Sequence, residues 1–353
     1  MRCLEEKTMS SDKPQNKTFN WRTLNTIWEK ITSFREATVV LIIIVIGFIL
    51  SLCSPHFLTM DNLMSVTIGL SAEGIVVVGM TIALVSGGFD FSVGSVMALS
   101  GVIAGELYLL NVNIWLACGI ALLVGMLFGL LNGFFIGRVG LNPFITTLAV
   151  MGIARGWSYV ITQGSPISIL GVSKSFTFIG QGKIIGLPFI VIVFLAIAII
   201  SDYMMRKSEP LRKVFYTGSN EKTAILSGID TTTVKIGVYL FVATLASVAG
   251  ILSMARFTVA TPATGLGADV SMKSISAAVI GGVSLSGGEG TILGAVLGVI
   301  LLNLINNGLI LLNIPVYWQD LMNGVILICA VTLDHVSHKN RQKNLKGKKF
   351  KGV

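Results

Sequence analysis

The chain alternates between long apolar segments and short polar connections over most of its length. Ten of these segments are long enough to cross a bilayer as an α-helix, which takes about 20 mostly apolar residues. They lie at about 38–54, 62–86, 92–110, 114–137, 142–162, 187–205, 236–254, 270–285, 290–312 and 317–334. The segment at 270–285 is the weakest of them. The pattern predicts an all-α, polytopic integral membrane protein with about ten transmembrane helices.

The composition fits a chain that lies mostly within the membrane. The 353 residues are 53% hydrophobic and 12% charged, with a mean hydropathy of +0.81, whereas an ordinary soluble domain is about 25% charged. We therefore expect a basic N-terminal tail at 1–36, a transmembrane domain at 37–334 and a basic C-terminal tail at 335–353. The first tail either is disordered or forms a short surface helix, which is predicted from the helical spacing of Trp21, Leu24, Trp28 and Ile31.

The distribution of positive charge predicts the orientation in the membrane. Of the 26 Lys and Arg residues, 20 fall in three regions, 1–36, 206–235 and the chain after His338. Lys and Arg are enriched in cytoplasmic loops, and an even number of spans places these three regions on one side. We expect both termini and the 206–235 loop to be cytoplasmic. The net charge of +9 then reflects topology and contact with membrane lipid, and no nucleic-acid partner is expected.

A glycine-rich polar segment interrupts the apolar sequence between the second and third spans. It contains Gly87, Gly88, Asp90, Ser92 and Gly94. Lipid would satisfy none of the polar groups of such a segment, so its backbone must pack within the protein or line water. Asp90 either caps the helix that begins near Ser92 or lines a transport path.

The same pattern recurs later in the chain. Ser286, Gly287, Gly288 and Gly294 repeat Ser86, Gly87, Gly88 and Gly94 at an offset of 200 residues. Both copies are followed by a span rich in small residues. Each copy joins a span predicted to run from outside to inside to a span predicted to run from inside to outside. The sequence thus suggests a parallel internal repeat, an arrangement found in many transporters, with chance similarity as the alternative.

Other polar residues within the predicted spans also have two interpretations. Arg155 lies about 20 Å along the span that begins near Asn142, and it either snorkels to the interface or donates hydrogen bonds to a polar solute. Glu73 and Glu106 could each pair with a partner or lie near a helix end. The neighbouring amides Asn306 and Asn307 are typical of contacts between helices rather than of ligand binding.

Several classes of function are disfavoured by the motifs that the sequence lacks. The segment 285–289 resembles the signature loop of ABC-type ATPases, but the chain has no Gly-x-x-x-x-Gly-Lys-Ser/Thr phosphate loop. It also has no His-Glu-x-x-His or Gly-x-Ser-x-Gly motif, and its four cysteines lack metal-ligand spacing. We expect no enzymatic activity, no catalytic residues, no metal and no cofactor. The three histidines lie at span ends or in the tail, which weakens the case for a proton-coupled carrier but leaves a sodium-coupled one open.

The polar loop 216–229 predicts a short, well-defined helix. Ser219 or Asn220 can cap a helix whose first turn carries Glu221 and which ends near Gly228. Ala224 is small enough for another protein surface to approach closely. Such a helix, held between two spans, can transmit a displacement, although it could also be only a connector.

Four motifs together resemble the permease subunits of bacterial ABC importers for ribose, xylose, galactose and related monosaccharides. The resemblance covers about residues 40–334, and the motifs are GMTIALVSGGFDFSVGSVMALSG, LNGFFIGRVGLNPFITTLAVMGIARG, YTGSNEKTAILSGI and AAVIGGVSLSGGEGTILGAVLGVILLNLINNG. It implies a polytopic permease in the bacterial cytoplasmic (inner) membrane that pairs with a second copy or a sibling permease. It also implies partner ATP-binding subunits in the cytoplasm and an extracytoplasmic sugar-binding protein.

The resemblance also assigns roles to individual residues. The segment that couples such permeases to their ATPases corresponds to Gly218, Asn220, Glu221, Ala224, Ser227 and Gly228. The translocation motif corresponds to Gly87, Gly88, Asp90, Ser92 and Gly94, and the start of the fifth span to Asn142, Pro143 and Phe144. One departure concerns the solute: Ser271 and Lys273 stand where the family usually has an acidic pair. A self-sufficient carrier coupled to ions or protons is the alternative function.

Overall fold

The computed structural model describes residues 35–263, 268–315, 317–319, 321–329 and 331–332. The predicted C-terminal tail, and the predicted N-terminal tail except its last two residues, lie outside this described part. The surface helix predicted around Trp21 and Trp28 lies outside it as well.

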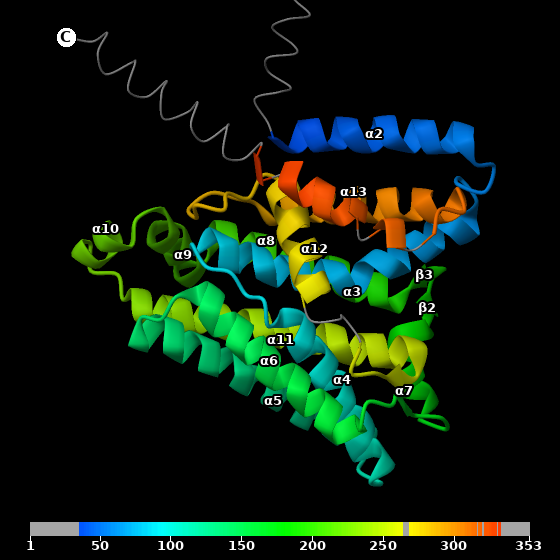
Figure 1. The fold of residues 1–353 in the computed structure, drawn as a ribbon, viewed down its shortest axis with the longest axis horizontal. Coiled ribbons are helices and arrows are strands. Elements are labelled where there is room, and N and C mark those ends of the chain that lie inside the picture. The colour runs from blue at the N-terminus through cyan, green and yellow to red at the C-terminus, as the bar shows by residue number, and fades with distance from the viewer. Residues whose placement is uncertain (1–34, 264–267, 316, 320, 330, 333–353) are drawn as a thin grey trace, which may run out of the picture.

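The described residues form helices with only four very short strands (Figure 1). The longer helices are α2 (Arg35–Cys53), α3 (Met60–Val85), α4 (Val93–Leu109), α5 (Ile114–Gly133), α6 (Pro143–Thr162), α8 (Phe189–Lys207), α11 (Thr231–Phe257), α12 (Ala268–Ile280) and α13 (Ile292–Leu311). Helix α5 continues as the π-helix η1 (Phe134–Val139). The short helices are α7 (Lys174–Gln181), α9 (Glu209–Ser219) and α10 (Glu221–Leu226). Strand β1 (Ile167–Ser168) pairs with β4 (Val259–Ala260), and β2 (Lys183–Ile184) pairs with β3 (Leu187–Pro188).

The helices agree with the predicted membrane spans. Seven helices of the described part are long and apolar enough to cross a membrane, and α4 and the end of α12 form two shorter apolar helices. A tenth helical stretch, at 317–319, 321–329 and 331–332, coincides with the last predicted span. The all-α, polytopic membrane fold is therefore confirmed. The weakest predicted span, 270–285, corresponds to α12, whose 13 residues extend only about 20 Å.

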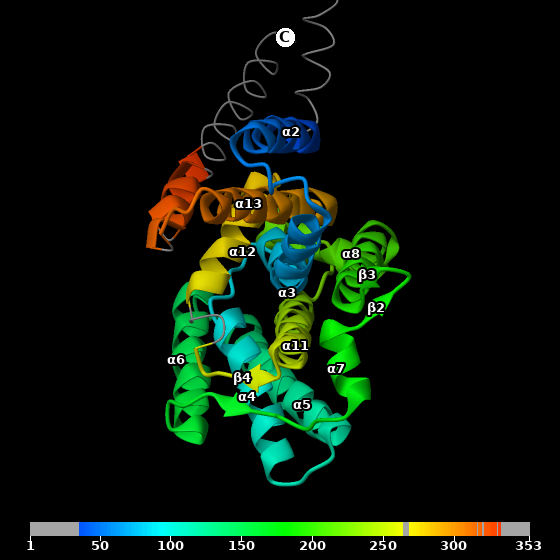
Figure 2. The same ribbon diagram turned by 90° about the vertical axis from the view of Figure 1, so that its right-hand side faces the viewer.

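Close approach between helices builds the core of the molecule. A Cβ added at Gly250 of α11 would lie 2.0 Å from the carbonyl oxygen of Met97 in α4, and one added at Gly298 of α13 would lie 1.9 Å from that of Ala277 in α12. Such contacts are typical of membrane proteins, where van der Waals packing between small residues holds helices together. Helix α3 is buried along most of its length and lies near the centre of the bundle (Figure 2).

The two ends of the bundle differ in structure. Helices α9 and α10 and the first residues of α2 lie at one end, and α7, β2 and β3 lie at the other (Figure 1). We call these the α10 end and the α7 end. The segment 86–92, which has no regular structure beyond turns, leads from α3 at the α10 end to the start of α4. The interruption predicted from the glycines is therefore present.

Candidate functional site

Helix α10 is a six-residue helix that is attached to the bundle by defined polar contacts. The side chain of Asn220 caps its start, with Oδ1 accepting a hydrogen bond from the Thr223 amide at 3.0 Å. Nζ of Lys235, in the first turns of α11, forms an ion pair with Oε1 of Glu221 at 2.5 Å. The turn after the helix contains Gly228 at a φ of +79°, a conformation that glycine adopts without a Cβ penalty. The short helix predicted for 216–229 is thus present and fixed to α11.

Two acidic residues stabilise the helices on either side of α10, which are α9 and α11. Asp230 caps α11, accepting hydrogen bonds from the hydroxyl of Thr233 and from the amides of Thr232 and Thr233. The Thr233 hydroxyl, followed by the Thr233 amide, lowers the pKa of Asp230. At the start of α9, the hydrogen bond and positive charge of Lys213 lower the pKa of Glu209. Both carboxylates are therefore charged at neutral pH.

The surface formed by α9 and α10 has features of a protein-binding site. A groove of about 260 Å³ is lined by Tyr216, Ser219, Asn220, Thr223, Ala224, Ser227 and Ile229. Beside it, Ile225 and Leu226 are 55% and 88% exposed. Large apolar side chains that project next to a groove are typical of surfaces that another protein covers. Sequence reasoning identified Ala224 and Ser227 but missed Ile225 and Leu226, whose apolar character within a polar loop was the available signal.

Directly before α10, three glycine-containing segments meet with almost no side chains between them. A Cβ added at Gly218 would lie 1.9 Å from the carbonyl oxygen of Val85 and 2.8 Å from the amide nitrogen of Gly288. A Cβ added at Gly287 would lie 2.8 Å from both the Gly218 oxygen and the Gly87 Cα. The Gly288 amide also donates a hydrogen bond to the Val85 oxygen at 2.8 Å. We call Gly87, Gly218, Gly287 and Gly288 the glycine junction; it brings the turns after α3 and α12 against the end of α9.

The glycine junction joins the two copies of the sequence repeat. Gly87 and Gly287 have nearly the same left-handed φ, +81° and +79°. Their neighbours differ, because Gly288 is also left-handed, at +76°, whereas Gly88 does not have a positive φ. The two turns are thus alike in position and in their first glycine, but their backbones diverge at the second glycine.

Asp90 lies in the interior just before α4. Its side chain is fully buried, and Oδ1 accepts hydrogen bonds from the amide and the hydroxyl of Ser92, at 2.8 and 2.6 Å. The side-chain amide of Asn132 in α5 donates to the same hydroxyl at 2.9 Å. Among the described residues, Oδ2 of Asp90 has no hydrogen-bond partner. Asp90 therefore orders the turn that leads into α4, whose N-cap residue, Ser92, makes no side-chain capping hydrogen bond.

Helix α6 begins at the predicted Asn-Pro-Phe sequence and exposes one of its faces. Asn142 caps it by accepting a hydrogen bond from the Phe144 amide at 2.9 Å, and Pro143 occupies its first turn. The ring of Phe144 packs edge-on against Phe91, with centroids 5.3 Å apart. The structure thereby brings the start of α6 next to the segment that contains Asp90.

Further along α6, Arg155 is exposed and its guanidinium lies 5.8 Å from the centre of the Tyr159 ring. Gly152 and Gly156 are exposed as well, with no atom within 4 Å of an added Cβ. An arginine on a membrane helix is costly in lipid and normally faces protein or water. This face of α6 is therefore suited to contact with another chain or with an aqueous path.

Polar side chains also link α3 and α13. Asn62 and Asn307 exchange two hydrogen bonds, at 2.8 and 3.1 Å. Asn303, which sequence reasoning missed, donates to Oε2 of Glu73 at 3.1 Å. Asn307 is thus a contact between helices, as its amide side chain suggested. The buried Oδ1 of Asn306 has no partner among the described residues.

The two positions that depart from the family pattern lie within this region. Ser271 is buried, and its hydroxyl donates to the Phe91 carbonyl at 2.9 Å. Lys273 lines a small cavity together with Glu73 and Asn303. Lys273 therefore lies at a cavity between α3, α12 and α13. In the part of the chain that the structure describes, no group of three or more His, Cys, Asp or Glu side chains could hold a metal ion.

Comparison with known proteins identifies the family. The family model described as "Branched-chain amino acid transport system / permease component" matches residues 62–331. The chain belongs to this permease family. It is 35% identical to the ribose import permease protein RbsC of Escherichia coli (strain K12) over 296 residues, 83% of this chain and 91% of that protein. No solved structure gives a significant match.

Two further relatives of this permease carry the names of other sugars. The D-allose transport system permease protein AlsC of Escherichia coli (strain K12) is 32% identical over 332 residues, 94% of this chain and 98% of that protein. The L-arabinose transport system permease protein AraH of the same strain is 35% identical over 288 residues, 82% of this chain and 87% of that protein. These relatives are transport permeases and not enzymes, and they extend the likeness over most of the chain.

Proposed function

We propose that this permease forms the translocation path of an ATP-driven importer for a monosaccharide or a similar small polar solute. The names of the similar ribose, allose and arabinose permeases support the solute class. The family description names branched-chain amino acids, so a sugar and leucine are the solutes to compare. The observation that carries the coupling mechanism is the glycine junction, because it joins the end of α9 to the turns after α3 and α12 through backbone contacts.

The orientation follows from the positive charges around the α10 end. Arg206 and Lys207 end α8, and Arg212 and Lys213 lie in α9. Lys and Arg are enriched in cytoplasmic loops, so the α10 end faces the cytoplasm, together with both chain termini. The α7 end then faces outward and receives solute from a sugar-binding protein.

The ATP-binding subunits bind at the groove between α9 and α10, beside which Leu226 is exposed. A displacement of α10 is passed to the bundle by two routes, the Glu221–Lys235 ion pair to α11 and the Gly218 contacts to the turns after α3 and α12. At Gly218 the contacts to both turns are between backbone atoms. Rotation of a side chain therefore cannot absorb the displacement. Closure of the ATPases therefore moves α3 and α13 relative to α11.

The path for the solute runs between two copies of the chain, or between this chain and a sibling permease, along the exposed face of α6. Gly152 and Gly156 let two helices approach closely, as small residues four apart do in membrane proteins. Arg155 of α6 can donate hydrogen bonds to the hydroxyl oxygens of a sugar, since a guanidinium carries five N–H donors.

Reconstitution tests this function. The permease is co-purified with an ATP-binding subunit and assayed in proteoliposomes for uptake of ribose, allose, arabinose and leucine, each presented with a matching binding protein. We expect uptake of a sugar that requires ATP, and no ATP hydrolysis by the permease alone. Uptake of leucine instead of any sugar would show that the solute class is wrong. Accumulation driven by membrane potential without an ATPase would select the alternative, an ion- or proton-coupled carrier.

A further inference from the structure

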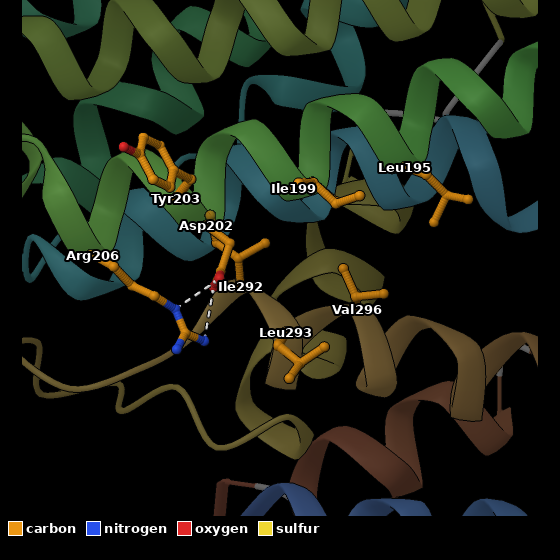
Figure 3. Close-up of a pocket in the computed structure, with 9 residues that line it drawn as sticks. Leu195, Ile199, Asp202, Tyr203, Arg206, Ile292, Leu293 and Val296 are labelled. Atoms are coloured by element: carbon orange, nitrogen blue, oxygen red, sulfur yellow. Dashed lines mark hydrogen bonds and ion pairs between the residues drawn. The ribbon is translucent and has the colours of Figure 1, made fainter.

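A second surface feature lies apart from α10, in a groove between α8 and α13 (Figure 3). The groove has a volume of about 500 Å³ and is lined by six residues of α8 between Leu195 and Arg206 and by three residues of α13 between Ile292 and Val296. The side chains of Leu195 and Ile199 point from α8 toward Leu293 and Val296 of α13. The side chains that line it are mostly aliphatic.

The polarity of the groove changes along its length. Its polar lining residues, Asp202, Tyr203 and Arg206, all lie toward the α10 end, and the remainder of the lining is apolar. From Leu195 to Arg206 the helix rises about 16 Å, at 1.5 Å per residue. One leaflet contributes about 15 Å to the hydrocarbon core of a bilayer. The groove therefore matches one leaflet in length and has its polar end at the membrane interface.

The groove is open to the surroundings of the bundle. Ile199 and Tyr203 of α8 are 67% and 65% exposed, and Leu293 of α13 is 50% exposed. Behind the groove, α8 is held against α3, because the ring of Phe194 packs where a Cβ of Gly74 would lie. Helix α6, whose exposed face is assigned to the second copy, lies on the other side of the molecule (Figure 2). That arrangement leaves the α8–α13 groove facing lipid.

Arg206 is positioned to bind an anionic group at the polar end. Its guanidinium is held by Asp202, with Nε 2.7 Å and Nη2 3.4 Å from the two carboxylate oxygens (Figure 3). A guanidinium has five N–H donors, so the Asp202 contacts leave donors for a phosphate. Lys207, the next residue, is exposed. Tyr203 has the amphipathic ring that is enriched at membrane interfaces.

We propose that the α8–α13 groove binds an anionic phospholipid of the cytoplasmic leaflet, with one acyl chain between α8 and α13 and the phosphate at Arg206. The assignment to this leaflet rests on the proposed orientation of the permease. Helix α8 continues through Ser208 into α9, and α13 follows the turn that contains Gly287 and Gly288. The lipid thus bridges two helices that are each connected to the glycine junction, and its binding restrains their relative movement.

Native mass spectrometry of the purified permease with added phosphatidylglycerol or phosphatidylcholine tests this binding without any transport assay. We expect one tightly retained lipid and about a fivefold preference for phosphatidylglycerol, because the positive charges of Arg206 and the exposed Lys207 exceed the negative charge of Asp202 by one. Arg206→Gln should remove the preference. Ala198→Trp should remove the retained lipid, because Ala198 lines the groove and is only 7% exposed. The control is Ile200→Trp, which adds the same ring at a position that is 57% exposed and outside the groove lining.

Equal lipid retention by the wild type and Ala198→Trp would overturn the proposal, as would equal binding of the two lipids by the wild type. Disulfide formation between two copies that each carry Leu293→Cys would also overturn it, since a second protein surface would then cover the groove. These outcomes are separate from failure of the proposed function, which is measured by solute uptake and not by lipid retention.

Discussion

Replacing Gly218 by alanine tests whether the glycine junction transmits force. The added methyl group would lie 1.9 Å from the Val85 carbonyl oxygen, whereas real Cβ contacts are essentially never closer than 3.0 Å. The end of α9 and the end of α3 must therefore separate by at least about 1.1 Å, the difference between those two distances. A contact to backbone cannot be relieved by a rotamer change. We expect the hydrogen bond from Gly288 to Val85, now 2.8 Å long, to be broken or lengthened.

The cost of this change can be compared with the benefit of the substitution. Overpacking of this kind costs about 1–3 kcal/mol, while alanine in a helix gains about 1 kcal/mol over glycine. The net destabilisation is about 0–2 kcal/mol, which is too small to prevent folding and insertion. The exposed surface of α10 is unchanged, so the ATPase should still bind. Gly218→Ala is therefore expected to hydrolyse ATP in the complex but to import much less solute per ATP.

The assay is the ratio of solute imported to ATP hydrolysed in proteoliposomes that contain the complete transporter. Gly237→Ala is the matched control, because Gly237 is also helical, in α11, and has no atom within 4 Å of an added Cβ. The control should keep the wild-type ratio. If Gly218→Ala also keeps that ratio while being incorporated normally, the glycine junction does not carry the coupling and the reasoning is refuted.

Three further predictions concern the polar contacts. Glu221→Arg should uncouple transport without preventing insertion. Combining it with Lys235→Glu should restore only the internal ion pair, so recovered uptake would show that Lys235, and not the ATPase, is the essential partner of Glu221. Asn307→Leu should destabilise the protein by about 1–2 kcal/mol, because Oδ1 of Asn62 loses its donor while Nδ2 keeps only its bond to the Phe57 carbonyl; a melting temperature equal to that of the wild type would contradict this. Because hydrogen bonds lower the pKa of Asp230 in the folded chain, its stabilisation should be full above the unfolded pKa of about 3.9 and lost as pH falls through the lower folded pKa. Thermal unfolding of Asp230→Asn should lack this acid-dependent loss, and an unchanged pH profile would disprove the assignment.

Apolar patterning located the helices because a helix in lipid must satisfy its own backbone hydrogen bonds. It was wrong about where α12 ends. The turn after Ile280 contains Gly281, Gly282, Val283 and Leu285, so its hydropathy continues that of the helix. Hydropathy reports burial in an apolar environment and does not distinguish a helix from a turn packed inside the protein. The predicted span therefore extended to residue 285, five residues past the end of the helix.

The contacts within the site were less accessible to sequence reasoning. The side chain of Asn220 acts within its own helix turn, so its capping role could be predicted from local sequence. The Ser92 hydroxyl that donates to Asp90 also accepts a hydrogen bond from Asn132, which is far along the chain in α5. Local sequence does not reveal this contact, so the two interpretations of Asp90 stayed open. The spacing of Asn303 and Asn307, four residues apart in α13, places them on one helix face. That spacing was the available signal for the missed contact of Asn303 with Glu73.

The attachments of α10 and of the segment 86–92 determine where the permease can bend. Helix α10 is fixed to α11 by the Glu221–Lys235 ion pair, and the same helix α11 holds the segment 86–92 through a hydrogen bond from the Tyr239 hydroxyl to the Phe89 carbonyl at 3.1 Å. The end of α3, in contrast, contacts α9 at Gly218. A movement of α3 relative to α11 must therefore be absorbed between Val85 and Phe89. Gly87 and Gly88 occupy that interval, and glycine accepts a wide range of backbone angles at little steric cost. The hinge of the transport cycle is thus expected at these two residues rather than within any of the long helices.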